Sequence, residues 1–169
     1  MSNRALTWIS AIFAIALGSW FLLGEAVEMT SGVDFCGSCH SMQAAARSYL
    51  QDAHGSNNSG GGGATCTDCH LPQDSQLKHL VFKVHAGARD LWAELLTDTR
   101  QIDWHEKRRH RESFVYDSGC LKCHSNLEAA TMANHKAYVG HRPYLLGQTR
   151  KVCVSCHSSV GHKDLGSFQ

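Results

Sequence analysis

The stretch Cys36-Gly37-Ser38-Cys39-His40-Ser41-Met42 carries the pattern that decides the fold of this chain. It is the first of four Cys-x-x-Cys-His motifs, and only this one has a methionine two residues after its histidine. The other three run from Cys66 to His70, from Cys120 to His124 and from Cys153 to His157. In such a motif the two thiols bond covalently to the edge of a porphyrin, and the adjacent imidazole can bind the iron. The sequence therefore predicts four covalently bound haem c groups.

This interpretation accounts for every cysteine, because the four motifs contain all 8 cysteines of the chain. The predicted attachment residues are Cys36, Cys39, Cys66, Cys69, Cys120, Cys123, Cys153 and Cys156. Zinc is the alternative, since Cys-x-x-Cys pairs also bind zinc as thiolates. Histidine makes up 12 of 169 residues, so the chance that one follows all four pairs is on the order of 10⁻⁵. This frequency favours haem, and a Soret band in the purified protein would decide the question.

The N-terminal region contains a segment long enough to span a membrane. Residues Ala5 to Gly24 form a run of 20 residues without a charge, which at 1.5 Å per residue matches a hydrocarbon core of about 30 Å. A cleaved signal peptide is the alternative, but its apolar region is usually about 7 to 15 residues long. Trp8 and Trp20 lie near the two ends of the segment, where interfacial indoles are expected, and Arg4 precedes it. We therefore expect an uncleaved anchor with its N-terminus on the cytoplasmic side.

Length and charge limit the fold and the partners. A length of 169 residues suits a single domain. A domain of this size that surrounds four porphyrins has little room for a conventional hydrophobic core. Strand signals are almost absent. We therefore expect a mostly α-helical, irregular fold, with a transmembrane anchor in residues 1–24 and a tetrahaem cytochrome c domain in residues 25–169. The formal net charge of +1 argues against nucleic acid as a partner.

A further helix is predicted from Gln73 to Leu96, where apolar residues recur at spacings of three and four. On another face of this helix Lys83, Gly87 and Asp90 fall at positions i, i+4 and i+7. The two charged residues are about 10 Å apart along the axis, too far for a direct ion pair. Either they bracket a group that approaches the backbone at Gly87, or they form an ordinary solvated face. Periodicity alone favours the solvated face.

Each haem iron needs two axial ligands, and each motif normally supplies one. His70, His124 and His157 are therefore predicted ligands, and eight further histidines are available for distal positions, namely His54, His79, His85, His105, His110, His135, His141 and His162. A histidine-rich ligand set lowers the haem potentials and suits a respiratory electron carrier. An iron with an open face beside the membrane could take electrons from a lipid-soluble quinol. Asp90 is then a candidate proton acceptor, and Lys83 could orient the quinol oxygen.

Along essentially its whole length the sequence resembles the NapC/NrfH family of membrane-anchored tetrahaem quinol dehydrogenases. The resemblance is carried by the single span, the four motifs, the Cys-His-x-Met of the first motif and the string Phe82-Lys83-Val84-His85-Ala86-Gly87-Ala88-Arg89-Asp90. It implies that Met42 binds the first iron in place of the motif histidine, with His40 as the alternative. It also implies that Asp90 lies on the distal side of that haem and that Lys83 lines a quinol pocket.

The resemblance also implies distal ligands for the later haems. His54 and His162 match the family's distal histidines before the second motif and after the fourth. This sequence differs from the shorter members of the family in containing His135 and His141. Either of them could close, within this chain, a haem that takes a lysine from the catalytic partner in nitrite reductase small subunits.

Within the family, the chain resembles the small subunits of cytochrome c nitrite reductases. This implies an enzyme subunit that oxidises quinol, expected to be menaquinol, at the first haem and passes electrons to a multihaem reductase, without reducing nitrite itself. The expected location is the bacterial inner membrane, with the haem domain on the periplasmic side. Two alternatives stay open: a different acceptor such as nitrate reductase, and an electron shuttle between proteins that does not oxidise quinol.

Overall fold

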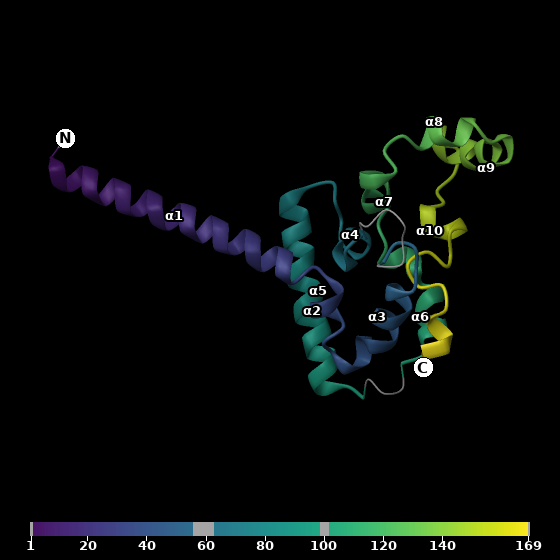
Figure 1. Cartoon of the computed structure of the whole chain (residues 1–169), viewed down its shortest axis with the longest axis horizontal. Coiled ribbons are helices and arrows are strands. Elements are labelled where there is room, and N and C mark those ends of the chain that lie inside the picture. The colour runs from purple at the N-terminus through teal and green to yellow at the C-terminus, as the bar shows by residue number, and fades with distance from the viewer. Residues whose placement is uncertain (1, 56–62, 99–101, 169) are drawn as a thin grey trace.

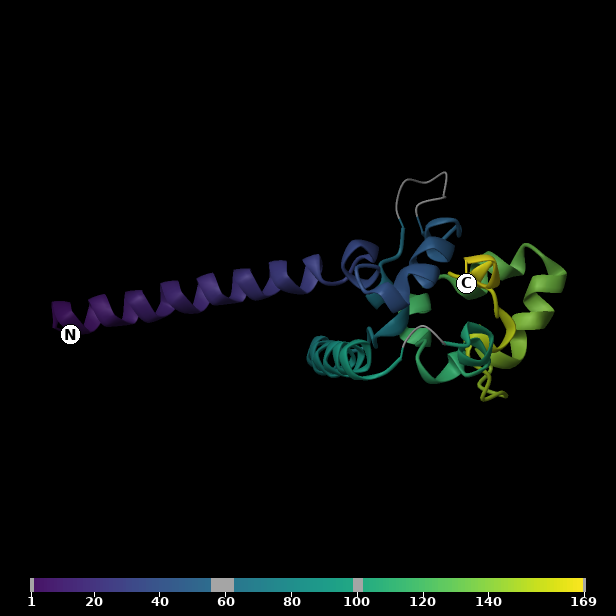
Figure 2. The ribbon, with the colours of Figure 1, turned by 90° about the horizontal axis from the view of Figure 1, so that it is seen from below.

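The computed structural model describes residues 2–55, 63–98 and 102–168, and in these residues it contains helices, turns and loops but no strand. Figure 1 shows one long N-terminal helix that projects from a small body of shorter helices, and Figure 2 shows the same arrangement from below. The prediction of a mostly α-helical, irregular fold with one N-terminal apolar helix is confirmed.

The N-terminal helix α1 (Asn3–Met29) has no buried residue and contains the predicted span. It continues five residues beyond Gly24, because residues 25–29 include neither glycine nor proline to stop it. It ends where the hydroxyl groups of Thr30 and Ser31 donate hydrogen bonds to backbone carbonyls of its last turn, at 2.6 and 2.5 Å. These bonds satisfy carbonyls that have no partner within the helix.

Short helices carry the haem motifs. They are α2 (Val33–Cys36) and η1 (His40–Met42) in the first motif, α4 (Cys66–His70) in the second, α7 (Asp117–Cys123) in the third and α10 (Cys153–Cys156) in the fourth. In the last three motifs the histidine lies at the end of the helix or directly after it. In the first motif the histidine begins a separate 3-10 turn that also contains the methionine.

The helix that was predicted from Gln73 is α5 (Gln76–Leu96). It begins three residues later than expected, because the side chain of Ser75 caps it by accepting a hydrogen bond from the Lys78 N–H at 3.5 Å. The N–H of Gln73 is committed elsewhere, since it donates to the hydroxyl of Ser118 at 3.0 Å. In Figure 1 α5 runs crosswise to α1, and in Figure 2 it is seen nearly end-on beside the end of α1.

The remaining helices complete the body. They are α3 (Gln43–Leu50), α6 (Trp104–Arg109), η3 (Arg111–Ser113), α8 (Leu127–Met132), α9 (His135–Leu145) and η4 (Leu165–Phe168). Ala44 and Ala45 of α3 pack against Leu165 of η4, with Met42 and Trp104 at the edge of this cluster. The C-terminal segment thereby closes onto the segment that follows the first motif.

The polypeptide has only a small apolar core. The chain exposes 12408 Å² of surface, compared with about 8,200 Å² expected for a compact monomer of this mass. Part of the difference is the projecting helix α1, all of whose residues are at least partly exposed. Helix α5, which has no buried residue, and the short helices of the body also contribute, as expected for a chain whose interior is shared with large macrocycles.

Candidate functional site

The first cysteines of the motifs meet in pairs. The Cys66 thiol donates a hydrogen bond to the sulfur of Cys36, and this bond lowers the pKa of the Cys36 thiol to about 7. Cys120 is paired with Cys153 in the same way. Ligand atoms of Asp117, Cys120 and Cys153 all lie within 4.8 Å of one another. Because each cysteine is an attachment point on a porphyrin edge, these contacts bring motif 1 against motif 2 and motif 3 against motif 4.

The cluster of Asp117, Cys120 and Cys153 does not have the composition of a zinc site. Structural zinc sites built from Cys-x-x-Cys pairs use both thiols of each pair, and they have four ligands. Here only the first thiol of each motif takes part, and the second thiols, Cys123 and Cys156, are exposed. Among the described residues the donor set therefore fits haem attachment better than zinc.

Motifs 2 and 3 touch through their backbones. The Tyr116 N–H donates to the carbonyl of Cys69 at 3.1 Å, and the Lys122 ammonium bonds to the Asp68 carboxylate at 2.7 Å. At this contact α7 requires Gly119, because a Cβ built there would overlap the backbone carbonyl of Asp68. The four motifs thus follow one another in space in the order in which they occur in the sequence.

Three pairs of imidazole rings face one another, and each pair contains the histidine of one motif. The ring centroids are 6.1 Å apart for His70 and His162, 6.3 Å for His54 and His124, and 5.9 Å for His141 and His157. Metal–imidazole nitrogen bonds of about 2.0–2.1 Å, with about 1.1 Å more to each ring centre, place two axial rings roughly 6.3 Å apart. The separation of the ring centroids in each pair is therefore close to that of two imidazoles that share one iron.

One ring of each pair is oriented through its Nδ1 atom. Nδ1 of His70 lies 3.0 Å from the carbonyl of Phe114, and Nδ1 of His141 lies 2.8 Å from the carbonyl of Ala137. A carbonyl only accepts, so Nδ1 carries the proton and leaves Nε2 free to bind a metal.

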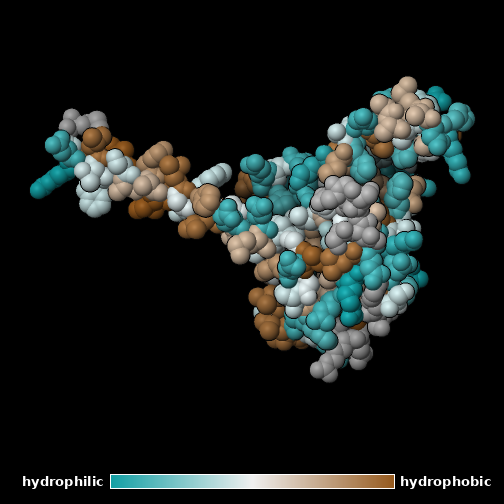
Figure 3. All heavy atoms as spheres, in the orientation of Figure 1, coloured by the Kyte–Doolittle hydropathy of each residue, from teal (hydrophilic) through white to brown (hydrophobic). Residues whose placement is uncertain are grey.

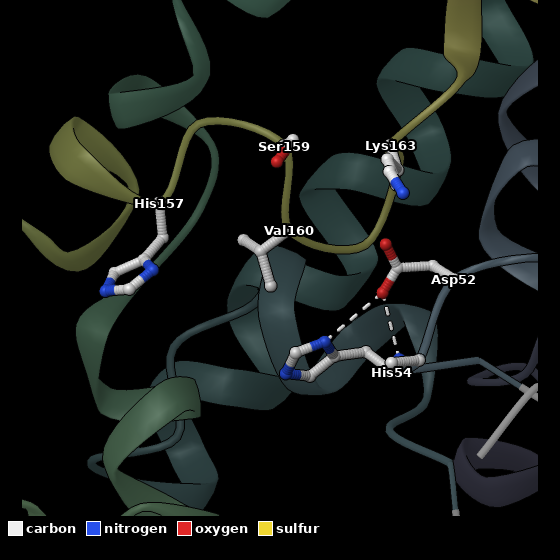
Figure 4. Close-up of a pocket in the computed structure, with 7 residues that line it drawn as sticks. Asp52, His54, His157, Ser159, Val160 and Lys163 are labelled. Carbon is white, nitrogen blue, oxygen red and sulfur yellow. Dashed lines mark hydrogen bonds and ion pairs between the residues drawn. The ribbon is translucent and has the colours of Figure 1, made fainter.

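His54 is oriented by a carboxylate. Oδ1 of Asp52 lies 3.2 Å from Nδ1 of His54 and also accepts from its backbone N–H at 2.9 Å. Figure 4 shows both bonds, and it shows His54 and His157 on two sides of a hollow that Val160 and Lys163 also line. The hollow therefore lies between His54, which faces the histidine of motif 3, and His157, the histidine of motif 4.

Burial keeps the rings of the second motif's pair neutral. It lowers the pKa of His70, and burial together with the neighbouring His70 lowers the pKa of His162 to about 4. The neutral imidazole is the form that binds metals. Nδ1 of His162 is buried and has no hydrogen-bond partner among the described residues. An unpartnered buried nitrogen beside another imidazole is consistent with a ligand site.

The first motif is organised differently. His40 is exposed, and no ring contact among the described residues pairs it with another histidine. Met42 is half-buried and packs against the cluster that Ala44, Ala45 and Leu165 form. Both residues lie in η1, so the structure places two candidate ligands in the same turn.

The charged face of α5 lies beside the first motif. The charges of Lys83 and Asp90 act on the thiol of Cys36, and Gly87 between them has open space where a side chain would be. Lys83 Nζ donates to the carbonyl of Thr30 and the hydroxyl of Ser31, both at 2.9 Å, and burial lowers its pKa. The structure therefore brings Lys83 and Asp90 together with motif 1 and the end of α1, although periodicity alone had favoured a solvated face.

The sequence reasoning missed Glu94. It lies one turn beyond Asp90 on the same face of α5, and its charge, like that of Asp90, acts on the thiol of Cys39. One of its carboxylate oxygens, Oε2, is buried and has no hydrogen-bond partner in the described structure. The spacing of four residues from Asp90 was the available signal, because it places two carboxylates on one face.

The structure distinguishes the two histidines that the sequence had left as alternatives. His141 faces His157, whereas no described ring lies opposite His135, at the start of α9. His79 bonds through Nδ1 to the carbonyl of Pro72, and His110 bonds to Glu106. Among the described residues, the six rings of the three pairs are the histidines that face another imidazole.

Comparison with known proteins identifies the family. The model of the NapC/NirT cytochrome c family, N-terminal region, matches residues 1–166. NapC of Haemophilus influenzae is 29% identical over 176 residues, which cover 96% of this chain and 82% of that protein. CymA of Shewanella oneidensis, a tetraheme c-type cytochrome, is 29% identical over 163 residues, covering 88% and 84%. TorC of Escherichia coli K12 is 26% identical, and the chain spans only 42% of its length.

A solved structure shares the fold. It is a crystal structure of the cytochrome c nitrite reductase NrfHA complex bound to the HQNO inhibitor, of which one chain aligns with a TM-score of 0.57 and 24% identity. The alignment covers 94% of this chain and 90% of that chain. The resemblance stated from the sequence is thereby confirmed, and with it the four covalently attached haem c groups. This chain is a membrane-anchored tetrahaem cytochrome that belongs to the NapC/NirT cytochrome c family.

Proposed function

We propose that this protein is the quinol dehydrogenase subunit of a respiratory complex and takes electrons from quinol, expected to be menaquinol, at the first haem. The observation that carries the proposal is the position of motif 1, which lies beside both the end of α1 and the charged face of α5. Lys83 connects these parts, because it bonds to Thr30 and Ser31 while its charge reaches Cys36. A lipid-soluble donor would meet the chain at this point.

The residues at this position suit the chemistry. Oxidation of a quinol to a quinone releases two electrons and two protons, and the haem, when bound, accepts the electrons. The Asp90 side chain is 55% exposed, and Arg89 donates two hydrogen bonds to its Oδ1. Its other oxygen can therefore take a proton from the quinol and return it to water. Lys83 uses two of its three N–H donors on the end of α1, which leaves one to hold a quinol oxygen.

The ring pairs support two axial ligands for each of the three later haems, and the first haem receives one. We assign His70 with His162, His124 with His54, and His157 with His141, and for the first haem Met42, with His40 as the alternative. Electrons would then pass through the motifs in sequence order, since neighbouring motifs are in contact at each step.

The proposed acceptor is a multihaem reductase, with cytochrome c nitrite reductase as the first candidate and this chain as its electron-delivering subunit. The shared fold with a chain of the nitrite reductase complex supports a partner of this kind. His141 opposite His157 supplies a second ring from this chain, so no haem with a motif histidine requires a lysine from a partner. This favours keeping a different periplasmic acceptor, such as nitrate reductase, as the second candidate. The proposed location is the bacterial inner membrane with the haem domain in the periplasm.

The proposal is tested by Asp90→Asn in the full-length holoprotein reconstituted into liposomes. We expect haem reduction by a menaquinol analogue to slow roughly 100-fold, because a general base is lost, while four haems remain bound. Glu112→Gln is the matched control, since this carboxylate belongs to η3. Unchanged reduction by quinol in Asp90→Asn would remove the assigned role.

The acceptor is identified by isolating the complex. Copurification of the intact assembly from native membranes, followed by mass spectrometry, would show which reductase is bound. A shuttle between proteins predicts a different result, in which reduced protein donors reduce the anchored chain but quinol analogues in liposomes do not.

A further inference from the structure

Helix α5 has its apolar side turned away from the body. Six residues at spacings of three and four form one stripe along its length, namely Leu77, Val81, Val84, Ala88, Trp92 and Leu95. The five larger members are between 56% and 73% exposed. We call this stripe the outer face of α5.

The inward side of the same helix is polar. Lys83, Asp90 and Glu94 lie there and reach motif 1, as their effects on Cys36 and Cys39 show. In a soluble protein an amphipathic helix packs its apolar stripe on the core and leaves its polar side in water. In α5 this order is reversed, and within the described residues no other helix covers the outer face. A contiguous exposed apolar stripe of this length indicates an interaction surface.

The position of α5 relative to α1 indicates what covers it. Lys83, near the middle of α5, bonds to Thr30 and Ser31 directly after α1 ends. Thr30 is six residues past the predicted end of the span at Gly24, which is about 9 Å along a helix. The headgroup region of a bilayer is roughly 5 to 8 Å thick on each side. Thr30 then lies at the outer edge of the headgroups, and the bonds of Lys83 hold the polar side of α5 there. Because a helix with its side chains is about 10 Å across, the opposite side of α5 can reach back into the headgroups.

The direction of the outer face agrees with this depth. α5 runs crosswise to α1 in Figure 1, so if α1 crosses the bilayer, α5 lies along its surface. In Figure 3 brown, hydrophobic atoms gather where Figure 1 places the C-terminal half of α5, on the side toward which α1 projects. Trp92 belongs to the outer face, and Lys78 and Arg89 are exposed at its margin. Indoles and cations beside an apolar stripe are typical of helices that lie in a membrane interface.

We propose that α5 is an interfacial membrane helix, with its outer face inserted among lipid headgroups and upper acyl chains. The chain then has two membrane contacts, α1 across the bilayer and α5 along it. Two contacts fix the orientation of the body as well as its distance from the lipid. This inference requires α1 to span the membrane and does not depend on quinol oxidation.

The test uses single cysteines in the full-length holoprotein, whose 8 native cysteines are consumed by haem attachment. Val81→Cys and Leu95→Cys report on the outer face. Gln76→Cys, at the start of α5, and Lys136→Cys, on the distant helix α9, are matched exposed controls. Each variant is placed in phosphatidylethanolamine–phosphatidylglycerol vesicles at no more than one chain per vesicle. Alkylation by a charged, water-soluble maleimide is then timed and normalised to the rate in the unfolded protein.

We expect alkylation of the two outer-face thiols to be at least tenfold slower than that of the controls. Equal rates at all four positions would overturn the proposal. A second measurement shows whether lipid or protein covers the outer face. Vesicles that contain a phosphatidylcholine with a diazirine on its acyl chain are irradiated, and the peptides of α5 are analysed by mass spectrometry. Lipid adducts on outer-face residues support the proposal. Slow alkylation without lipid adducts on α5 would show that protein covers the face, and this result also overturns it.

Discussion

The first haem motif and the three later motifs differ in what stands opposite the motif histidine. His70, His124 and His157 each face a second imidazole at about the separation that an iron with two imidazole ligands requires. His40 is exposed and faces none among the described rings. In place of a second imidazole, motif 1 has the charged face of α5 with Lys83 and Asp90.

Under the proposed function, this difference would separate two tasks within one small chain. Two fixed imidazoles close both faces of an iron and leave it able only to pass electrons. A motif with a charged, partly exposed helix face beside it keeps room for a substrate and for a proton acceptor. The proposal therefore assigns electron conduction to the later three motifs and electron entry to motif 1. Variants in both regions of the chain test this division.

The largest effect is expected at the joint between motifs 2 and 3. Gly119→Ala should destabilise the holoprotein by about 3 kcal/mol, because the new Cβ overlaps the carbonyl of Asp68 and the backbones of α4 and α7 must separate. Gly140→Ala is the control, since a Cβ at that position of α9 meets nothing within 4 Å, and alanine should stabilise a helix by about 0.5–1 kcal/mol. Denaturant unfolding measures both. Equal stability of the two variants would show that the joint is not tight.

The next effect concerns the fourth motif. His141→Ala should convert one haem in four from a six-coordinate to a five-coordinate spectrum, because the ring opposite His157 is lost. Added imidazole should restore the original spectrum. His135→Ala should change nothing, and a spectral change there without one in His141→Ala would reverse the assignment. Visible and electron paramagnetic resonance spectra provide the measurement.

A third pair of variants tests the exceptional motif. Met42→Leu should alter the spectrum and potential of one haem and leave the other three unchanged, whereas His40→Leu should leave the spectrum intact, because His40 is exposed. The opposite outcome would identify His40 as the axial ligand of the first haem iron. Motif 1 would then differ from the others only in its surroundings. Redox titration followed by absorbance distinguishes the two results.

The smallest effect is expected at the ion pair of Lys122 and Asp68. Although it bridges motifs 2 and 3 at 2.7 Å, the Lys122 side chain is 55% exposed, so Lys122→Met should cost only about 0.5 kcal/mol. The loss should shrink further in concentrated salt, where exposed charges are screened. A loss as large as that of Gly119→Ala would mean that charge, and not close backbone packing, holds the two motifs together.

Several features could be predicted because they depend on neighbouring residues. The haem motifs, the apolar span and the helical character of Gln76–Leu96 are local patterns. The helix that contains the predicted span continues to Met29, since helix formers at residues 25–29 extend it beyond the apolar run. The pair of Lys83 and Asp90 was found by spacing, but spacing alone could not show that it lies beside Cys36.

The sequence by itself determined where the haems attach, because covalent attachment requires two cysteines and a histidine within five consecutive residues. Only the tertiary structure decided which distal histidine faces which motif. His54 and His124 are 70 residues apart and His70 and His162 are 92 residues apart, so only the path of the chain can bring them together. The same holds for α5. Periodicity reveals that a helix has an apolar stripe, but the direction of that stripe depends on the bonds that tie Lys83 to the end of α1.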